Sequence, residues 1–416
     1  MKIHKKVFKD TNRYLMITLF SNIANFARNF AVARLLGPYL TGLCMNLLII
    51  PQTVVYLNLG LPDALTFIVP YNRGKSNDEY AVSVKNKIFS FITFIALIAF
   101  AVVLLFVLIF HHLRINIYFI YAALFAFLGQ FIRFFTANFA AERNFVKLGW
   151  VEFSYAALLL VLSILLIIPF KAHGFWLALI ITNIAIIIYS LLDYLKHSKI
   201  SFVSFNLKEI NSLYPLGIVM TLSAAIYIPF INLSKLFITA TIDVQSVGYF
   251  VLSIFIISII SIIPKTISRV VMPHMSAMRG SEENFGTIYG LFFKTQLYTL
   301  GLAFFTVLLG FIFIGPVVRN FLPKYIAGIP AARIMLIAAL PYCLIDNANN
   351  LLIVTHNKKN LLRIFVVVLI AQLAALVLLM FYKVNILNIS LSLVIVFTLY
   401  AFLLNYQVFR LKKSAL

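Results

Sequence analysis

Residues 148–169, LGWVEFSYAALLLVLSILLIIP, and residues 174–195, GFWLALIITNIAIIIYSLLDYL, decide the fold of this chain. Each stretch is long enough to cross a hydrocarbon core of roughly 30 Å as an α-helix. Similar runs recur along all 416 residues, and only 11% of the residues are charged. Soluble domains carry about 25% charged residues. The sequence therefore predicts an all-α polytopic membrane protein.

The hydropathy pattern predicts about twelve transmembrane helices. Pro51 and Pro62 predict a kink or break in the long second helix, and Pro341 does so in the tenth. The expected spans are residues 13–35, 41–70, 88–110, 115–139, 148–169, 174–195, 213–239, 246–270, 288–315, 327–355, 361–382 and 386–409.

The net charge of +22 is distributed in a way that argues against nucleic-acid binding. The basic residues lie in short loops between apolar runs and do not form one patch. Of the 34 lysines and arginines, 24 fall on one side of the predicted bundle and about eight on the other. The positive-inside rule then predicts that both termini are cytoplasmic. The first span lacks a small-residue cleavage site, so we expect it to be uncleaved.

An internal repeat is visible in the loops. Gly42 and Gly248 follow corresponding outer loops and are 206 residues apart. Arg73-Gly74 and Arg279-Gly280 end the spans that follow, with the same offset. Halves with an even number of spans share one orientation. We therefore expect two parallel six-helix lobes, residues 1–208 and 209–416, around a central cleft.

The first span carries a polar stripe. Thr18, Asn22, Asn25 and Asn29 recur at spacings of four, three and four residues, which places them on one face of a helix. Arg28 flanks this stripe. Such a face makes interhelical hydrogen bonds or lines a water-filled cavity. The charge of Arg28 favours the cavity, because a dry contact would leave a guanidinium difficult to satisfy.

Other ionisable residues lie at membrane depth, where they are costly and mark candidate functional sites. Arg133 follows Gln130 by one turn in the fourth span, and Lys235 lies near the outer end of the seventh. Asp63 and Asp346, the latter in a run of asparagines, are the deep acids. Each acid is expected to pair with an intramembrane arginine or to bind a proton or cation.

Sequence motifs for enzymatic chemistry are absent. The chain has no phosphate-binding glycine loop with Lys-Ser/Thr, no HExxH and no nucleophile elbow. Its two cysteines, Cys44 and Cys343, lie inside apolar runs and indicate neither a disulfide framework nor a metal site. We expect neither enzyme activity nor a cofactor. The function that remains is the movement of a solute or lipid across the bilayer.

Several short motifs, in their order and spacing, resemble bacterial polysaccharide exporters and O-antigen flippases. They are Arg34 to Pro38 followed by Thr41-Gly42, the run Leu57 to Leu65, Val247-Gly248-Tyr249, and Phe321 to Gly328. The resemblance covers the whole chain. It implies the polysaccharide transporter family, in the superfamily that also holds multidrug/cation antiporters and lipid II flippases. The chain differs from the usual lipid II flippases in having twelve predicted spans instead of fourteen. It also has Lys235 where an acidic residue is common in the family.

The resemblance implies a flippase of the bacterial inner membrane. Its substrate would be an undecaprenyl-pyrophosphate-linked oligosaccharide, an O-antigen or related repeat unit, carried from the cytoplasmic to the periplasmic leaflet by alternating access. The implied partners are this substrate, membrane lipid and a downstream polysaccharide polymerase. The sugar composition, the energy coupling and the oligomeric state stay open.

We hypothesise that a cationic cavity binds the pyrophosphate through charge-assisted hydrogen bonds. An alternative is a multidrug/cation antiporter that depends on Asp63 or Asp346, and a third is a membrane-embedded glycan enzyme. The candidate cavity residues are Arg28, Arg133, Asn22, Asn25, Asn29, Gln130 and Lys235.

Overall fold

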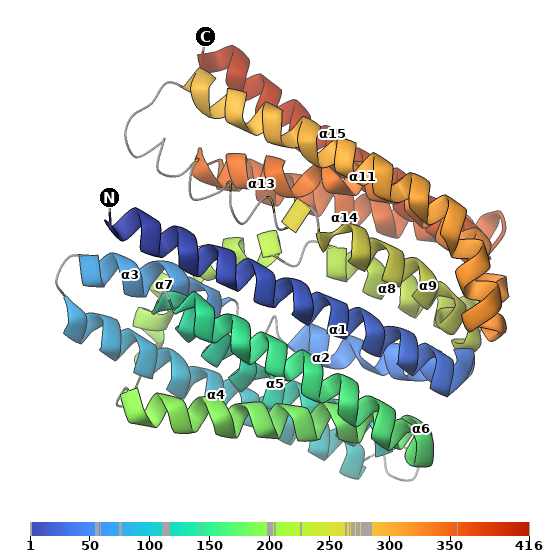
Figure 1. Ribbon diagram of the computed structural model, residues 1–416, viewed down its shortest axis with the longest axis horizontal. Helices are drawn as coiled ribbons and strands as arrows, with labels where there is room; N and C mark the ends of the chain where they lie inside the picture. The colour runs from blue at the N-terminus through green and yellow to red at the C-terminus, as the bar shows by residue number, and fades with distance from the viewer. Residues whose placement is uncertain are drawn as a thin grey trace. The chain divides into compact units, whose positions relative to one another are not determined.

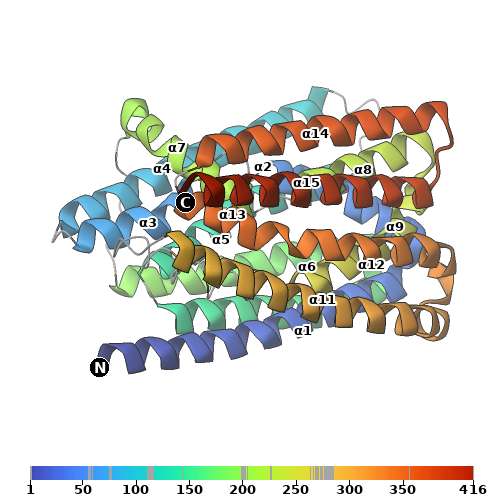
Figure 2. The ribbon, with the colours of Figure 1, turned by 90° about the horizontal axis from the view of Figure 1, so that it is seen from above.

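A computed structural model shows a helical chain (Figures 1 and 2). No β-strand occurs in the part of the chain that the structure describes. Eight helices there are long and apolar enough to cross a membrane, and Ile228–Thr241 and Val244–Ile260 are shorter apolar helices. The protein is therefore a multi-pass membrane protein, and the predicted all-α class is confirmed. The described residues are 2–54, 58, 60–74, 77–109, 117–142, 144–197, 203, 205–224, 227–262, 264–265, 267, 271, 275, 285–355 and 357–415.

Contacts divide the chain into two compact units. The first comprises Met1–Leu36 and Leu47–Ala225, and the second comprises Gly37–Asn46 and Ile226–Leu416. The expected lobe boundary between residues 208 and 209 stays a prediction. The second marker of the repeat, Arg279-Gly280, lies outside the described residues.

The first unit contains most of α1 and the six helices that follow. Its core is built where α3, α4, α5 and α7 pack around Phe89, Phe134 and Phe135, whose rings lie 5.0 to 6.5 Å apart between centroids. The helices are α1 (Lys2–Leu47), α2 (Ile49–Val54), α3 (Leu61–Gly74), α4 (Asp78–Ile109), α5 (Ile117–Ala141), α6 (Phe145–His197) and α7 (Leu207–Ala224).

Two of these helices contain sharp turns. The backbone of α1 is non-helical at Gly37, where φ is +73°, and Pro38 follows. Glycine adopts this left-handed conformation without the steric cost that a side chain adds. In α6 the backbone turns at Lys171, two residues after Pro169, so this helix contains both the fifth and the sixth predicted spans.

The predicted second span is interrupted. After α1 ends at Leu47, α2 ends at Val54 and α3 begins only at Leu61. Pro51 lies inside α2 and Pro62 lies in the first turn of α3, where a missing backbone N–H costs little. The break leaves polar backbone groups inside the span, and side chains of α5 reach them.

Three ion pairs link helices at one end of the first unit. They join the start of α4 to the end of α5, the start of α4 to the start of α7, and the two ends of α6. This is the end on which the sequence places cytoplasmic lysines. The pairs are Lys85 with Glu142 (2.7 Å), Lys87 with Glu209 (2.6 Å), and Lys147 with Asp193.

In the second unit, the tenth predicted span is broken beside Pro341, as expected: α12 ends at Cys343 and α13 begins at Ile345. Figure 2 shows α14 and α15 running alongside each other in this unit. Its elements are α8 (Tyr227–Thr241), α9 (Val244–Ile260), α11 (Phe285–Phe321), the 3₁₀ helix η3 (Pro323–Gly328), α12 (Ile329–Cys343), α13 (Ile345–Val354), α14 (Lys358–Phe381) and α15 (Ile386–Ala415).

The predicted seventh span forms two helices that belong to different units. Its first part, α7, ends at Ala224 and packs on α3 of the first unit. Its second part, α8, begins at Tyr227 and packs on α9 and α14 of the second unit. The hydropathy pattern predicts one continuous span here and gives no sign of this division.

Candidate functional site

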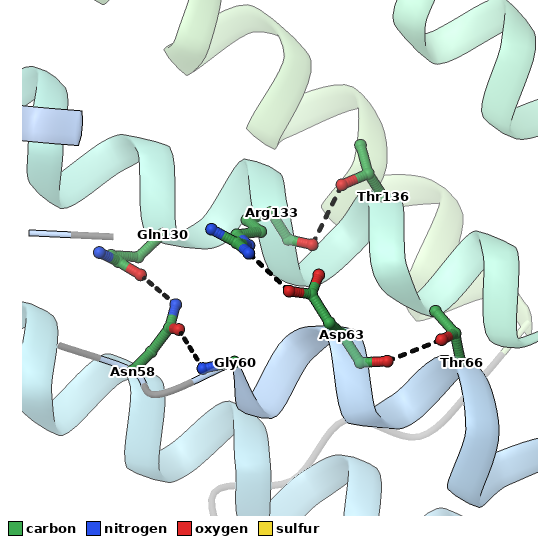
Figure 3. Close-up of polar contacts among 7 residues, drawn as sticks. All are labelled: Asn58, Gly60, Asp63, Thr66, Gln130, Arg133 and Thr136. Carbon is green, nitrogen blue, oxygen red and sulfur yellow. Dashed lines mark hydrogen bonds and ion pairs between the residues drawn. The ribbon is translucent and has the colours of Figure 1, made fainter. Parts of the chain in front are cut away.

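Gln130 of α5 holds the break in the second span (Figure 3). Its side-chain Oε1 accepts a hydrogen bond from Asn58 Nδ2 at 2.8 Å, and its Nε2 donates to the carbonyl oxygen of Val54 at 3.1 Å. Asn58 Oδ1 in turn accepts from the backbone N–H of Gly60 at 3.0 Å. Gln130 and Asn58 are almost fully buried. These bonds satisfy backbone groups that a continuous helix would have paired.

Arg133 lies one turn further along α5 and forms an ion pair with Asp63 of α3. Its Nη2 donates to Asp63 Oδ2 at 2.5 Å, and Figure 3 shows the two side chains pointing toward each other. Asp63 is in the first turn of α3, where the helix dipole favours a carboxylate. The hydroxyls of Thr66 and Thr136 donate to the backbone carbonyls of Asp63 and Arg133, respectively.

The ion pair between Arg133 and Asp63 is only partly buried. The side chain of Arg133 is 22% exposed and that of Asp63 is 27% exposed. A guanidinium has five N–H donors in a planar fork. It can therefore hold a carboxylate on one side and offer donors to a second anion, or exchange one for the other.

Arg28 of α1 has a different setting. Its guanidinium carbon lies 5.3 Å from the centre of the Phe175 ring on α6, and Phe175 is fully buried. Its Nη1 donates to Asn29 Oδ1 at 3.3 Å. Tyr155 of α6 is within electrostatic range of the same guanidinium. The aromatic contact orients the guanidinium over the ring.

The polar stripe of α1 is half-buried in the first unit. Asn22, Asn25 and Asn29 are all of intermediate exposure. The start of this helix packs closely on α6, because a Cβ on Gly149 would lie 3.1 Å from the Tyr14 ring. The Tyr14 hydroxyl also donates to Glu152 Oε2 at 3.4 Å. The first unit thus holds Arg28, the three asparagines, Gln130 and Arg133.

Lys235 lies apart from these residues, on α8 of the second unit. Its side chain is only 3% exposed, and its Nζ donates to the backbone carbonyl of Met45 at 3.0 Å. Met45 belongs to the segment of α1 that groups with the second unit. Lys235 therefore binds the protein's own backbone in this structure.

The second unit has a buried polar cluster centred on the break between α12 and α13. Gln296 Nε2 donates to the Leu344 carbonyl at 2.9 Å and to Asn405 Oδ1 at 3.2 Å. Asn405 Nδ2 donates to the same carbonyl at 3.3 Å. Asn347 Nδ2 donates to Thr299 Oγ1 at 3.3 Å. As at Gln130, side chains from neighbouring helices form hydrogen bonds with a backbone group at the break in a span.

Asp346 lies in this cluster, and Oδ2 of its carboxylate is buried with no hydrogen-bond partner among the described residues. Tyr400 lies beside it, and Lys265 is within electrostatic range. The Asn347 side-chain oxygen is likewise buried without a partner in the described part of the chain. Buried oxygens left unpaired in this way can accept a proton or coordinate a cation.

In this cluster Asp346 stands out in the sequence as a deep acid, whereas Gln296, Tyr400 and Asn405 do not stand out. Gln296 and Asn405 are 109 residues apart in the sequence, and only tertiary packing brings them together. No group of three or more His, Cys, Asp or Glu side chains suited to a metal ion occurs among the described residues.

Known proteins resemble this chain in sequence and in fold. The family model for polysaccharide biosynthesis proteins matches residues 31–322. No curated protein sequence matches the chain.

Several solved transporters share the fold. An inward-facing multidrug resistance transporter of the MATE family in the MOP superfamily aligns with a TM-score of 0.73 at 15% identity, covering 98% of this chain and 100% of that one. The lipid II flippase MurJ, in an inward closed conformation, aligns with a TM-score of 0.70 at 15% identity over 95% and 87% of the two chains. A MOP superfamily transporter from Pyrococcus furiosus aligns with a TM-score of 0.68 at 14% identity over 98% and 95%.

The match to the family model covers most of the sequence, and the similar structures cover nearly all of it. The broken spans and their supporting side chains thus lie in a fold that solved transporters share. The chain belongs to the polysaccharide biosynthesis protein family.

Proposed function

We propose that the protein is a flippase for undecaprenyl-pyrophosphate-linked oligosaccharides, an O-antigen or related repeat unit. It would move them from the cytoplasmic to the periplasmic leaflet by alternating access. The observation that carries this proposal is the match to the polysaccharide biosynthesis protein family over residues 31–322. The fold shared with the lipid II flippase MurJ supports it.

The first unit offers suitable chemistry for such a head group. Pyrophosphate is a dense anion that loses hydration on entering a protein, and arginines offset this loss by charge-assisted hydrogen bonds. Arg28 and Arg133 are the proposed anion ligands. Asn22, Asn25, Asn29 and Gln130 supply amides for sugar hydroxyls, and Lys235 is the proposed cation of the second unit. The polyprenyl tail stays in lipid throughout.

The proposed orientation places both termini in the cytoplasm and the protein in the bacterial inner membrane. The distribution of lysines and arginines supports it. In this orientation the ion-paired end of the first unit is cytoplasmic. A polysaccharide polymerase is the proposed downstream partner, because it would consume the flipped substrate and pull transport forward.

The proposed energy source is ion or proton coupling at a buried acid. Asp63 is the weaker candidate, because its carboxylate is already paired with Arg133 at 2.5 Å. Asp346 is the stronger one, because one of its carboxylate oxygens is buried without a hydrogen-bond partner among the described residues. The same feature of Asp346 favours the second candidate function, a multidrug/cation antiporter.

Replacement of the two arginines tests the flippase proposal. In cells lacking their own flippase, we expect Arg28→Ala and Arg133→Ala to lower surface polysaccharide at least tenfold per molecule of protein in the membrane. Lysine at either position should be milder, because it keeps the charge but loses the planar fork. Arg333→Ala, at an exposed arginine of α12, is the matched control and should export normally.

Normal surface polysaccharide in both arginine variants would rule out the proposed anion role. Export of a toxic organic cation that is lost on Asp346→Asn and unaffected by the arginine variants would favour the antiporter instead.

A further inference from the structure

The turn inside α6 has a backbone that fixes the residues after it. Lys171 has φ +49°, which a side chain disfavours, and Pro169 lies two residues before it. A Cβ on Gly174 would overlap the carbonyl oxygen of Leu166, so only glycine fits there. An ion pair also joins the two ends of α6, which makes this helix a hairpin with two arms. The turn therefore sets the position of the next residue, Phe175.

Aromatic packing holds the Phe175 ring in place. The ring of Trp176 lies 5.5 Å from it between centroids, at an interplanar angle of 88°. Phe125 of α5 in turn lies 6.4 Å from Trp176. Phe175 and Trp176 are both fully buried, and side chains packed in this way have little freedom to change rotamer. Phe175 is thus a fixed part of the first unit.

Arg28 of α1 lies over this fixed ring. Its guanidinium carbon is 5.3 Å from the ring centre, within the distance of about 6 Å at which an aromatic face attracts a cation. Tyr155, on the other arm of the α6 hairpin, is within electrostatic range of the same guanidinium. Each arm of α6 therefore places an aromatic residue near Arg28.

A fixed ring changes what Arg28 contributes to binding. An arginine side chain has many rotamers, and ordering it in one of them when a ligand binds costs free energy. A ring that already holds the guanidinium removes part of this cost before the ligand arrives. The ring attracts the charge of the guanidinium, whereas an anion is bound through its N–H donors. The two contacts are therefore compatible.

We propose that Phe175 is a positioning residue for the anionic head group of the substrate. This inference rests on the proposed function, because it takes Arg28 as a ligand of the pyrophosphate. Phe175 does not touch the head group itself. It holds the Arg28 guanidinium ready for the anion, so the affinity for pyrophosphate depends on the negative charge at the face of the Phe175 ring.

Fluorinated phenylalanines test this role, because fluorine withdraws negative charge from the ring face and changes the size of the ring little. We expect one, two and three fluorines on Phe175 to weaken binding of undecaprenyl pyrophosphate by the purified protein in steps, by about fivefold in all. In Arg28→Gln, which lacks the cation, the same series should have no effect. Fluorination of Phe170, an exposed residue of the same hairpin, is the matched control and should leave binding unchanged.

Equal binding across the series at Phe175, together with weaker binding by Arg28→Ala, would overturn the positioning role, because Arg28 would then act without the ring. Failure of the proposed function looks different. The parent and Arg28→Ala would bind the lipid equally, or neither would bind it, and the positioning role would fall together with the anion role.

Fluorine NMR tests the contact between Arg28 and Phe175 without any lipid. The resonance of a singly fluorinated Phe175 should shift in Arg28→Gln, because a charge 5.3 Å from the ring centre is lost. The resonance of a singly fluorinated Phe170 should shift much less. A Phe175 resonance that does not respond to Arg28→Gln would contradict the contact on which the positioning role depends.

Discussion

The ion pair between Asp63 and Arg133 neutralises two charges and is also partly exposed. Their side chains neutralise each other at 2.5 Å, which satisfies two charges at membrane depth. Both also keep part of their surface exposed, which leaves the guanidinium accessible to a second anion. A structural role and a binding role for Arg133 therefore predict different behaviour when the charges are exchanged.

Exchanging the two charges separates these roles. Asp63→Ala alone should destabilise the protein by about 3 kcal/mol or less, because removal of one partner from a fully buried pair costs about 3–5 kcal/mol and this pair is partly exposed. The double change, Asp63→Arg with Arg133→Asp, should restore the melting temperature of the purified protein but not polysaccharide export. Recovery of both would show that Arg133 serves only to pair with Asp63.

At this scale the sequence located the charges but not their partners. Arg28, Arg133, Asp63, Asp346 and Lys235 are visible as ionisable residues in apolar runs. Asp63 and Arg133 are 70 residues apart, and only tertiary packing brings them together. The sequence predicts Lys235 as a residue that lines the cavity, and the structure shows its ammonium bound to the Met45 carbonyl. A backbone carbonyl leaves no signal in sequence.

Among the helices, the interruptions are the informative features. The second span breaks before α3 and the tenth breaks after α12, and both breaks are held by amide side chains from neighbouring helices. Gly60, at φ +76°, lies at the first break, and its backbone N–H is bound by Asn58. The backbone conformation of Gly60 therefore helps to set the position of Asp63, three residues later.

Gly60→Ala should therefore be costly. A side chain in the left-handed region costs about 1–2 kcal/mol, so the melting temperature of the purified protein should fall. Gly301→Ala, in the open middle of α11, should be neutral or should stabilise by about 0.5–1 kcal/mol. A Gly60→Ala protein as stable as the Gly301→Ala control would contradict the inferred strain.

Prolines predicted some of these interruptions and not others. Pro62 and Pro341 lie beside breaks that the structure contains. Pro215 lies inside α7, which continues past it, whereas the division between α7 and α8 comes after Ala224. Proline shows where a helix can break, but packing decides whether it does. For α7 and α8 the deciding contacts lie in different units.

For the molecule as a whole, hydropathy predicted the all-helical membrane fold, and the family match and similar structures confirm it. The 206-residue offset was visible in the sequence as two markers. One of them, at Gly42 and Gly248, proves to be a physical contact between the equivalent positions. The identity of the cargo is a different matter, because it depends on how a mobile head group meets a few side chains.

The proposed cargo can be measured directly in vesicles. Purified protein would be reconstituted with an undecaprenyl-pyrophosphate-linked oligosaccharide in both leaflets, and a membrane-impermeant glycosidase added outside. The account predicts that the glycosidase eventually cleaves the inner pool as well, and that Arg28→Ala with Arg133→Ala leaves that pool protected. An inner pool that stays equally protected in vesicles with and without the protein would contradict the account.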